Sequence, residues 1–146
     1  METLVKTLEE LDAEAVRLVN GLTTKEDEAT LVTLSGELGA GKTAFVKAVA
    51  KVFGIEETVN SPTFVLEKIY QLGGPTAKFE RLIHIDAYRL ENGNNLAQIG
   101  FDEIMKDAKN LILLEWPEKV AGALPKPTVN ISFRVLPNDS RIISYG

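Results

Sequence analysis

The sequence predicts a three-layer α/β domain with a mixed, mainly parallel sheet and a C-terminal β-hairpin. Segments of helical periodicity alternate with short apolar runs, as expected of helices that cross over between strands. The run Leu111–Leu114 is continuously apolar, which indicates a strand covered on both faces. Two alternating segments near the C-terminus flank a Pro-Asn-Asp-Ser turn, which is typical of a hairpin.

The first half of the chain contains two predicted helices around one predicted strand. Apolar residues recur at three- and four-residue steps from Thr7 to Leu22, and Thr7 with Glu10 forms a capping box. A short apolar run, 31–34, predicts a strand, and a second helix is expected over 44–53. Gly54 ends that helix.

The second half of the chain is predicted to be richer in strands. The segments 64–70 and 81–88 read as an antiparallel pair, because the turn around 73–75 is short. A helix over 96–105 is interrupted or restarted at Gly100. The covered strand ends at Pro117. The final hairpin pairs 129–136 with 141–145.

Length and composition fit one domain over residues 1–146, with 45% hydrophobic residues to form a core. The absence of cysteine excludes disulfides and thiolate chemistry, and the single His84 excludes a multi-histidine metal site within one chain. No apolar stretch is long enough to span a membrane, and the N-terminus has no signal-peptide pattern. We therefore expect a cytoplasmic protein without membrane contact.

The formal net charge of −5 is concentrated near the N-terminus. Residues 1–30 contain eight acidic and three basic residues, so the remainder of the chain is balanced. Composition therefore gives no argument for direct nucleic-acid binding through an excess of basic residues.

The segment Gly36–Thr43 matches the phosphate-binding pattern G-x-x-x-x-G-K-[ST] between a predicted strand and a predicted helix. Its glycines let backbone N–H groups turn toward phosphate oxygens, and the helix N-terminus adds its own. Lys42 supplies a charge for the outer phosphates, and Thr43 a hydroxyl for Mg²⁺. The predicted nucleotide contacts are Glu37, Leu38, Gly39, Ala40, Gly41, Lys42, Thr43, Ala44 and, farther along the chain, Thr63.

A phosphate loop needs an acidic partner for its magnesium, usually at the end of a neighbouring buried strand. Glu115 directly follows the covered strand and is the predicted metal ligand beside Thr43. Asp86 is its competitor, either as a ligand or in positioning the attacking water. We therefore predict Lys42, Asp86 and Glu115 as the catalytic residues.

Other residues near these motifs have two interpretations each. His84, Asp86 and Tyr88 share one face of a strand, which is either part of a site or simply solvated. His84 itself is expected to be structural or to contact a partner. Thr63 either meets the γ-phosphate or lies in a turn, and Arg89 is a weak candidate for phosphate contact. Trp116 either packs or shelters the nucleotide base.

The chain resembles the bacterial TsaE family of small ATPases in tRNA threonylcarbamoyladenosine biosynthesis. The resemblance covers about residues 31–120. It is carried by these segments: LGAGKT (38–43), SPTF (61–64), HIDAYRL (84–90), IGFDEIM (99–105) and LEWPE (114–118).

The resemblance implies a P-loop NTPase fold that binds ATP and Mg²⁺ through Lys42 and Thr43, with Thr63 in a switch-like loop. It also implies that Asp86 and Glu115 are the acidic residues of the site. The family acts with the TsaD and TsaB proteins, which modify N6 of adenosine 37 in tRNA, so contact with tRNA is indirect. ATP hydrolysis is expected to reset that complex. Two alternatives are a small-molecule P-loop kinase and a nucleotide-gated binding module with incidental hydrolysis.

Overall fold

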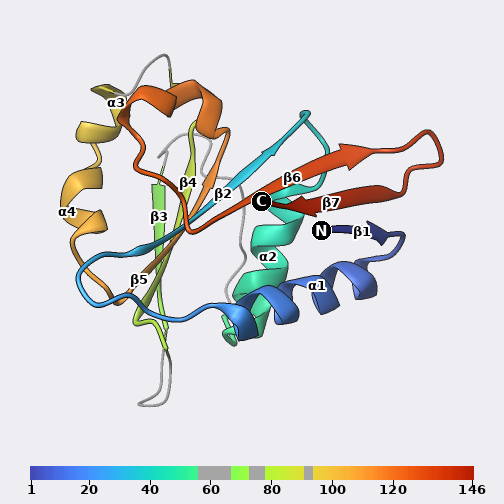
Figure 1. The fold of residues 1–146 in the computed structure, drawn as a ribbon, viewed down its shortest axis with the longest axis horizontal. Coiled ribbons are helices and arrows are strands. Elements are labelled where there is room, and N and C mark those ends of the chain that lie inside the picture. The colour runs from blue at the N-terminus through green and yellow to red at the C-terminus, as the bar shows by residue number, and fades with distance from the viewer. Residues whose placement is uncertain (56–66, 73–77, 91–93) are drawn as a thin grey trace.

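The computed structural model describes residues 1–55, 67–72, 78–90 and 94–146 (Figure 1). Within these residues, seven strands form one sheet in the order β1-β7-β6-β2-β5-β4-β3. The strands are β1 (Glu2–Val5), β2 (Thr30–Gly36), β3 (Glu67–Gln71), β4 (Arg81–Asp86), β5 (Asn110–Glu115), β6 (Val129–Val135) and β7 (Arg141–Tyr145).

The sheet is mixed, as predicted, with its parallel pairs at the centre. Strands β6, β2, β5 and β4 run parallel to one another, whereas β1–β7, β7–β6 and β4–β3 pair antiparallel. The predicted C-terminal hairpin is confirmed as β6 and β7. Three of the six neighbouring pairs are parallel, so parallel pairing defines the middle of the sheet rather than most of it.

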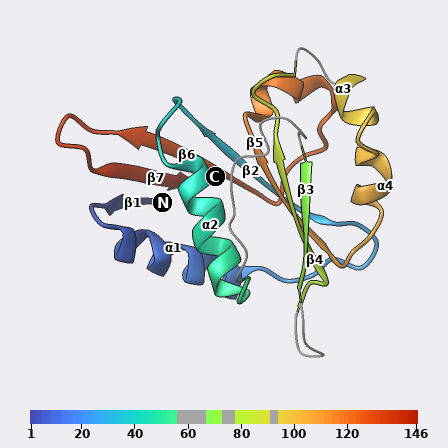
Figure 2. The same cartoon turned by 180° about the vertical axis from the view of Figure 1, so that it is seen from behind.

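Helices cover both faces of the sheet, which confirms the three-layer prediction (Figures 1 and 2). One face carries α1 (Leu8–Gly21) and α2 (Lys42–Val52). The other carries α3 (Asn94–Ala97), α4 (Phe101–Met105) and the 3-10 helix η1 (Pro117–Ala123). Among the described helices, none has the length and apolarity needed to cross a bilayer.

The helix ends follow local sequence signals. Thr7 caps α1, because its Oγ1 accepts a hydrogen bond of 3.1 Å from the backbone N–H of Glu10. The predicted interruption at Gly100 is confirmed, since this residue is left-handed and separates α3 from α4. These signals are local, which is why the sequence reveals them.

Each face of the sheet has its own apolar core. The core under α1 and α2 includes Phe45, Val49, Leu82, Leu113 and Ile131. The core under α3, α4 and η1 includes Leu31, Ile83, Ile112, Leu114 and Phe101. Alternate residues of the central strands enter the two cores, so these strands are covered on both sides.

The sequence did not predict β1, which precedes α1. Only four residues long, β1 pairs with β7 at the other end of the chain, with Glu2 opposite Ser144. Non-local pairing of this kind leaves no signal in a short local pattern. The start of the strand predicted from residue 64 and the turn at 73–75 lie outside the described residues.

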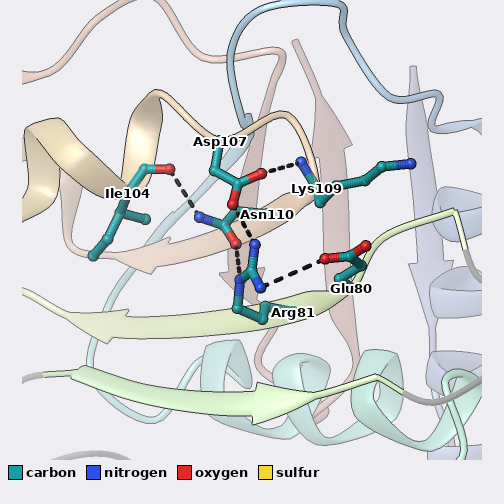
Figure 3. A network of polar contacts seen from close by, with 6 residues as sticks. All are labelled: Glu80, Arg81, Ile104, Asp107, Lys109 and Asn110. Carbon is teal, nitrogen blue, oxygen red and sulfur yellow. Dashed lines mark hydrogen bonds and ion pairs between the residues drawn. The ribbon is translucent and has the colours of Figure 1, made fainter.

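A polar network fixes the first residues of β4 against those of β5 (Figure 3). The Nε of Arg81 donates to Oδ1 of Asn110 at 2.6 Å, and its guanidinium forms an ion pair with Asp107. The amide of Asn110 in turn donates to the carbonyl oxygen of Ile104 at 2.9 Å. Arg81 and Asn110 are register partners, so this network sets the alignment that places Asp86 beside Glu115 at the opposite strand ends.

Candidate functional site

The glycine-rich loop begins where β2 passes very close to β6. Gly36 has a φ of +145°, and a Cβ at this position would lie 2.6 Å from the carbonyl oxygen of Phe133. Any side chain here would clash with backbone, so the first glycine of the pattern is required by packing between strands. At the other end of the loop, Gly41 is left-handed with a φ of 106° and directly precedes α2.

The loop presents the N-terminus of α2 to the end of the sheet. Gly41 is the N-cap and contributes no side-chain cap to the first-turn N–H groups of Lys42, Thr43 and Ala44. Ala40 is buried, whereas Leu38 is 72% exposed at the tip of the loop. Uncapped amides at the positive end of a helix dipole are suited to an anion.

Lys42 is folded back over its own loop. Its Nζ donates to the carbonyl oxygens of Gly36 and Glu37, and lies 3.4 Å from the ring centroid of Trp116. Burial lowers the pKa of Lys42, while the nearby carboxylates of Glu115, Glu118 and Asp86 act in the opposite direction. The ammonium group is therefore at the mouth of the loop, surrounded by acceptors.

Thr43 and Glu115, the two residues predicted to hold magnesium, lie in direct contact. The hydroxyl of Thr43 lies 3.1 Å from both Oε1 and Oε2 of Glu115, which is only 2% exposed. Magnesium binds hard oxygen ligands at about 2.0–2.1 Å in octahedral geometry, which puts neighbouring ligand oxygens about 2.9 Å apart. These oxygens are thus of the right type and spacing to be neighbouring ligands of one magnesium ion.

Asp86 lies next to Glu115 but differs from it in environment. The two are register partners at the ends of β4 and β5. Asp86 is half-buried, and its Oδ1 accepts a hydrogen bond of 3.0 Å from the backbone N–H of Tyr88. The structure therefore brings Lys42, Thr43, Glu115 and Asp86 to one end of the sheet, with Glu115 in contact with the loop helix.

The face shared by His84, Asp86 and Tyr88 is not simply solvated. His84 is fully buried, and its Nε2 lies 2.5 Å from Oε2 of Glu115. The strand predicted over 81–88 ends at Asp86, and Tyr88 lies in the turn that follows, where it is 43% exposed. Because the ring is completely buried, it has no surface that a partner could contact. Of the two roles expected for His84, the structural one therefore remains.

Trp116 and Tyr88 form an aromatic wall beside the loop. Their ring centroids are 4.9 Å apart. Trp116 has a positive φ of 62°, a conformation that costs energy for a non-glycine residue and is often found at functional sites. Its backbone N–H donates to the carbonyl oxygen of Leu34 at 3.1 Å, which ties the Trp116 backbone to β2, and its ring lies over the ammonium group of Lys42. Trp116 thus packs against the ammonium group of the loop.

An open cavity of about 220 Å³ lies on the outer side of the loop. Ala40, Gly41 and Ala44 form its inner wall. The remaining lining residues come from the β1–α1 segment and the C-terminal hairpin: Val5, Lys6, Thr7, Leu8, Leu11, Phe133, Asp139 and Arg141. This cavity is mostly apolar and borders the glycine-rich loop.

Sequence reasoning missed the contribution of the C-terminal hairpin. The Nε of Arg141 donates to the carbonyl oxygen of Ala40 at 3.1 Å, and thereby connects the hairpin to the glycine-rich loop. These residues are 101 positions apart, and no local pattern marks such a contact. Thr63 lies outside the described residues, and Arg89 is exposed.

The fold and the loop together define a class, a three-layer α/β protein with a glycine-rich loop between β2 and α2. The family model described as "Threonylcarbamoyl adenosine biosynthesis protein TsaE" matches residues 5–143. The chain therefore belongs to the TsaE family, and its role lies in tRNA threonylcarbamoyladenosine biosynthesis.

Individual relatives agree with this assignment. The chain is 42% identical to the TsaE protein of Treponema pallidum over 120 residues, covering 82% of this chain and 84% of the relative. It is 36% identical to TsaE of Bacillus subtilis over 115 residues, covering 79% and 68%. The crystal structure of Bacillus subtilis YdiB superposes with a TM-score of 0.76 at 27% identity, covering 99% of this chain and 83% of that structure.

Proposed function

We propose that this protein is a magnesium-dependent ATPase that acts with the TsaD–TsaB complex in N6-threonylcarbamoylation of adenosine 37 in tRNA. The observation that carries the proposal is the meeting of Lys42, Thr43 and Glu115 at an uncapped helix N-terminus. Family membership favours this accessory role over a small-molecule kinase. Because the pathway modifies tRNA, the proposal retains the cytoplasm as its compartment.

In this proposal, each part of the site has one task. The backbone N–H groups of the loop and of the first turn of α2 hold the phosphates. Lys42 moves its ammonium group from the carbonyl oxygens of the loop to the outer phosphate oxygens. Thr43 and Glu115 hold magnesium, which neutralises charge on the outer phosphates. Asp86 accepts a hydrogen bond from water at the exposed edge of the site.

Lys42 is the one cation that this proposal assigns to the transferred phosphate, and it comes from the loop itself. P-loop hydrolases that lack a positioned arginine are slow until a partner completes the site. We therefore expect the purified protein to hydrolyse ATP slowly, and addition of TsaD and TsaB to raise the rate at least tenfold.

Steady-state ADP release, measured with and without the two partners, tests this expectation. A matched mixture that lacks TsaD controls for stimulation by protein alone. Fast hydrolysis that is insensitive to the partners would contradict the accessory role. Tight ATP binding that promotes assembly, but with no hydrolysis under any condition, would favour the nucleotide-gated binding module instead.

The nucleoside of ATP is proposed to occupy the cavity beside Ala40, Gly41 and Ala44. Phosphates bound at the start of α2 leave the rest of the molecule at this opening, and the apolar lining suits a purine ring. The volume of about 220 Å³ lies below the roughly 300 Å³ at which pockets for drug-sized ligands begin. A small cavity of this kind suits a single nucleoside.

Substitution Ala44→Leu should fill this cavity while leaving the backbone N–H of residue 44 in place. ATP should then bind at least tenfold more weakly, because the larger side chain displaces the base. Inorganic triphosphate, which has no base, should bind within about twofold of its wild-type affinity. Calorimetric titration of both ligands makes the comparison, and equal weakening of both would place the nucleoside elsewhere.

A further inference from the structure

His84 is a buried polar side chain with no assigned task in the proposed reaction. It lies on β4 under the first turn of α2 and is 0% exposed. Its Nε2 is 2.5 Å from Oε2 of Glu115, the acidic residue that also accepts from Thr43. A histidine in the core needs a polar partner, and here that partner belongs to the site itself.

The other ring nitrogen of His84 also indicates that the contact with Glu115 is the one that matters. Nδ1 of His84 is buried and has no hydrogen-bond partner within the part of the chain that the structure describes. A neutral ring with its proton on Nε2 donates to Glu115 and leaves Nδ1 as an acceptor. Within the described residues, the contact with the Glu115 carboxylate is therefore the only polar contact of the His84 ring.

The ring is mounted on a rigid part of the fold. His84 on β4 lies opposite Leu113 on β5. Two positions farther along the same two strands, Asp86 lies opposite Glu115. The network around Arg81 and Asn110 fixes this register at the other end of the strands (Figure 3). Displacement of the His84 backbone relative to that of Glu115 would require slippage of two buried strands.

We propose that His84 is a positioning residue, which donates from Nε2 to Oε2 of Glu115 and holds that carboxylate against Thr43 for binding a divalent cation. This inference rests on the proposed function, because it assigns the metal role to Thr43 and Glu115. Glutamate has three side-chain torsions, and a buried donor that restrains one oxygen fixes where the other one points. Residues that orient metal ligands in this manner commonly change metal affinity by about 10- to 100-fold when they are removed.

Two variants separate positioning from packing. His84→Leu places an apolar side chain of similar size in the core and removes the hydrogen-bond donor to Glu115. His84→Gln places an amide nitrogen near the position of Nε2 and restores it. Because glutamine fills the site less well than the ring does, rescue by this variant cannot be attributed to better packing.

The measurement is binding of Mn²⁺, a paramagnetic substitute for Mg²⁺, to the ADP complex of the full chain, followed by electron paramagnetic resonance. We expect His84→Leu to bind Mn²⁺ at least tenfold more weakly than wild type, and His84→Gln to lie within about threefold of it. ADP affinity in the presence of EDTA should remain within about twofold for both variants, since His84 does not contact the phosphate loop.

The kinetic readout should show the same separation. The rate kcat should fall in His84→Leu and recover in part at high Mg²⁺, whereas a purely structural role would not give recovery with metal. Wild-type Mn²⁺ affinity in His84→Leu, or equal loss in both variants together with loss of ADP binding in EDTA, would overturn the positioning role alone. Failure of the wild-type protein to bind ADP, or to bind Mn²⁺ in its presence, would overturn the proposed function and this inference with it.

Discussion

Substitution Lys42→Ala is expected to raise the Kd for ATP by about ten- to a hundredfold. The ammonium of Lys42 is the one charge that the loop itself directs toward its own mouth, where it lies against two carbonyl oxygens and the face of Trp116. A hydrogen bond to a charged group contributes about 1.5–3 kcal/mol, which corresponds to this range of affinity. Isothermal titration calorimetry with ATP and Mg²⁺ measures the change.

Lys47→Ala is the matched control for this experiment. Lys47 lies on the same helix but is exposed, and it does not line the cavity beside the loop. Its removal lowers the net charge equally, so a general electrostatic effect would appear in both variants. Equal affinity of the Lys42→Ala variant and the wild type would exclude the loop as the phosphate site.

Substitution Glu115→Ala should reduce ATP hydrolysis by at least about a hundredfold, the scale expected when a group that stabilises the transition state is lost. Glu115 is buried and connects Thr43 on α2 to His84 on β4. Without the carboxylate, magnesium loses one of its two proposed protein ligands. ATP binding measured in EDTA should be retained, because the phosphate contacts do not involve this residue.

Two further variants help to assign a cause to the expected loss of ATP hydrolysis. Glu103→Ala removes an exposed acidic residue of α4 and should hydrolyse ATP like the wild type. Glu115→Gln keeps the shape of the side chain and should lose the stimulation by Mg²⁺ with little change in melting temperature. If the Glu115→Ala variant still supports tRNA modification together with TsaD and TsaB, then hydrolysis is dispensable and nucleotide-gated binding is the function.

Local signals were sufficient to predict the elements that carry the site. The cap at Thr7, the break at Gly100 and the covered strand before Glu115 are each encoded within a few residues, and the structure confirms them. Chemistry suggested that Thr43 and Glu115 act together, since a predicted phosphate loop needs an acidic residue at a neighbouring strand end, and the structure places the two in contact. Here the local pattern and the topology impose the same arrangement.

Long-range contacts could not be predicted in this way. The pairing of β1 with β7 and the contact of Arg141 with Ala40 join segments that are far apart in the sequence, and only the folded sheet brings them together. The pairing of His84 with Glu115 was missed for a different reason. Alternation along a strand shows which residues share a face, but it does not reveal whether a helix covers that face.

The resting position of Lys42 has a consequence for turnover. Its ammonium group already satisfies two carbonyl oxygens and an aromatic face, so an arriving polyphosphate exchanges contacts instead of adding them to an unbound cation. The net gain in free energy is the difference between the two sets, and each departing product leaves the lysine with partners to return to. Such self-competition lowers affinity and favours quick release, which suits the proposed cycle of nucleotide binding and hydrolysis.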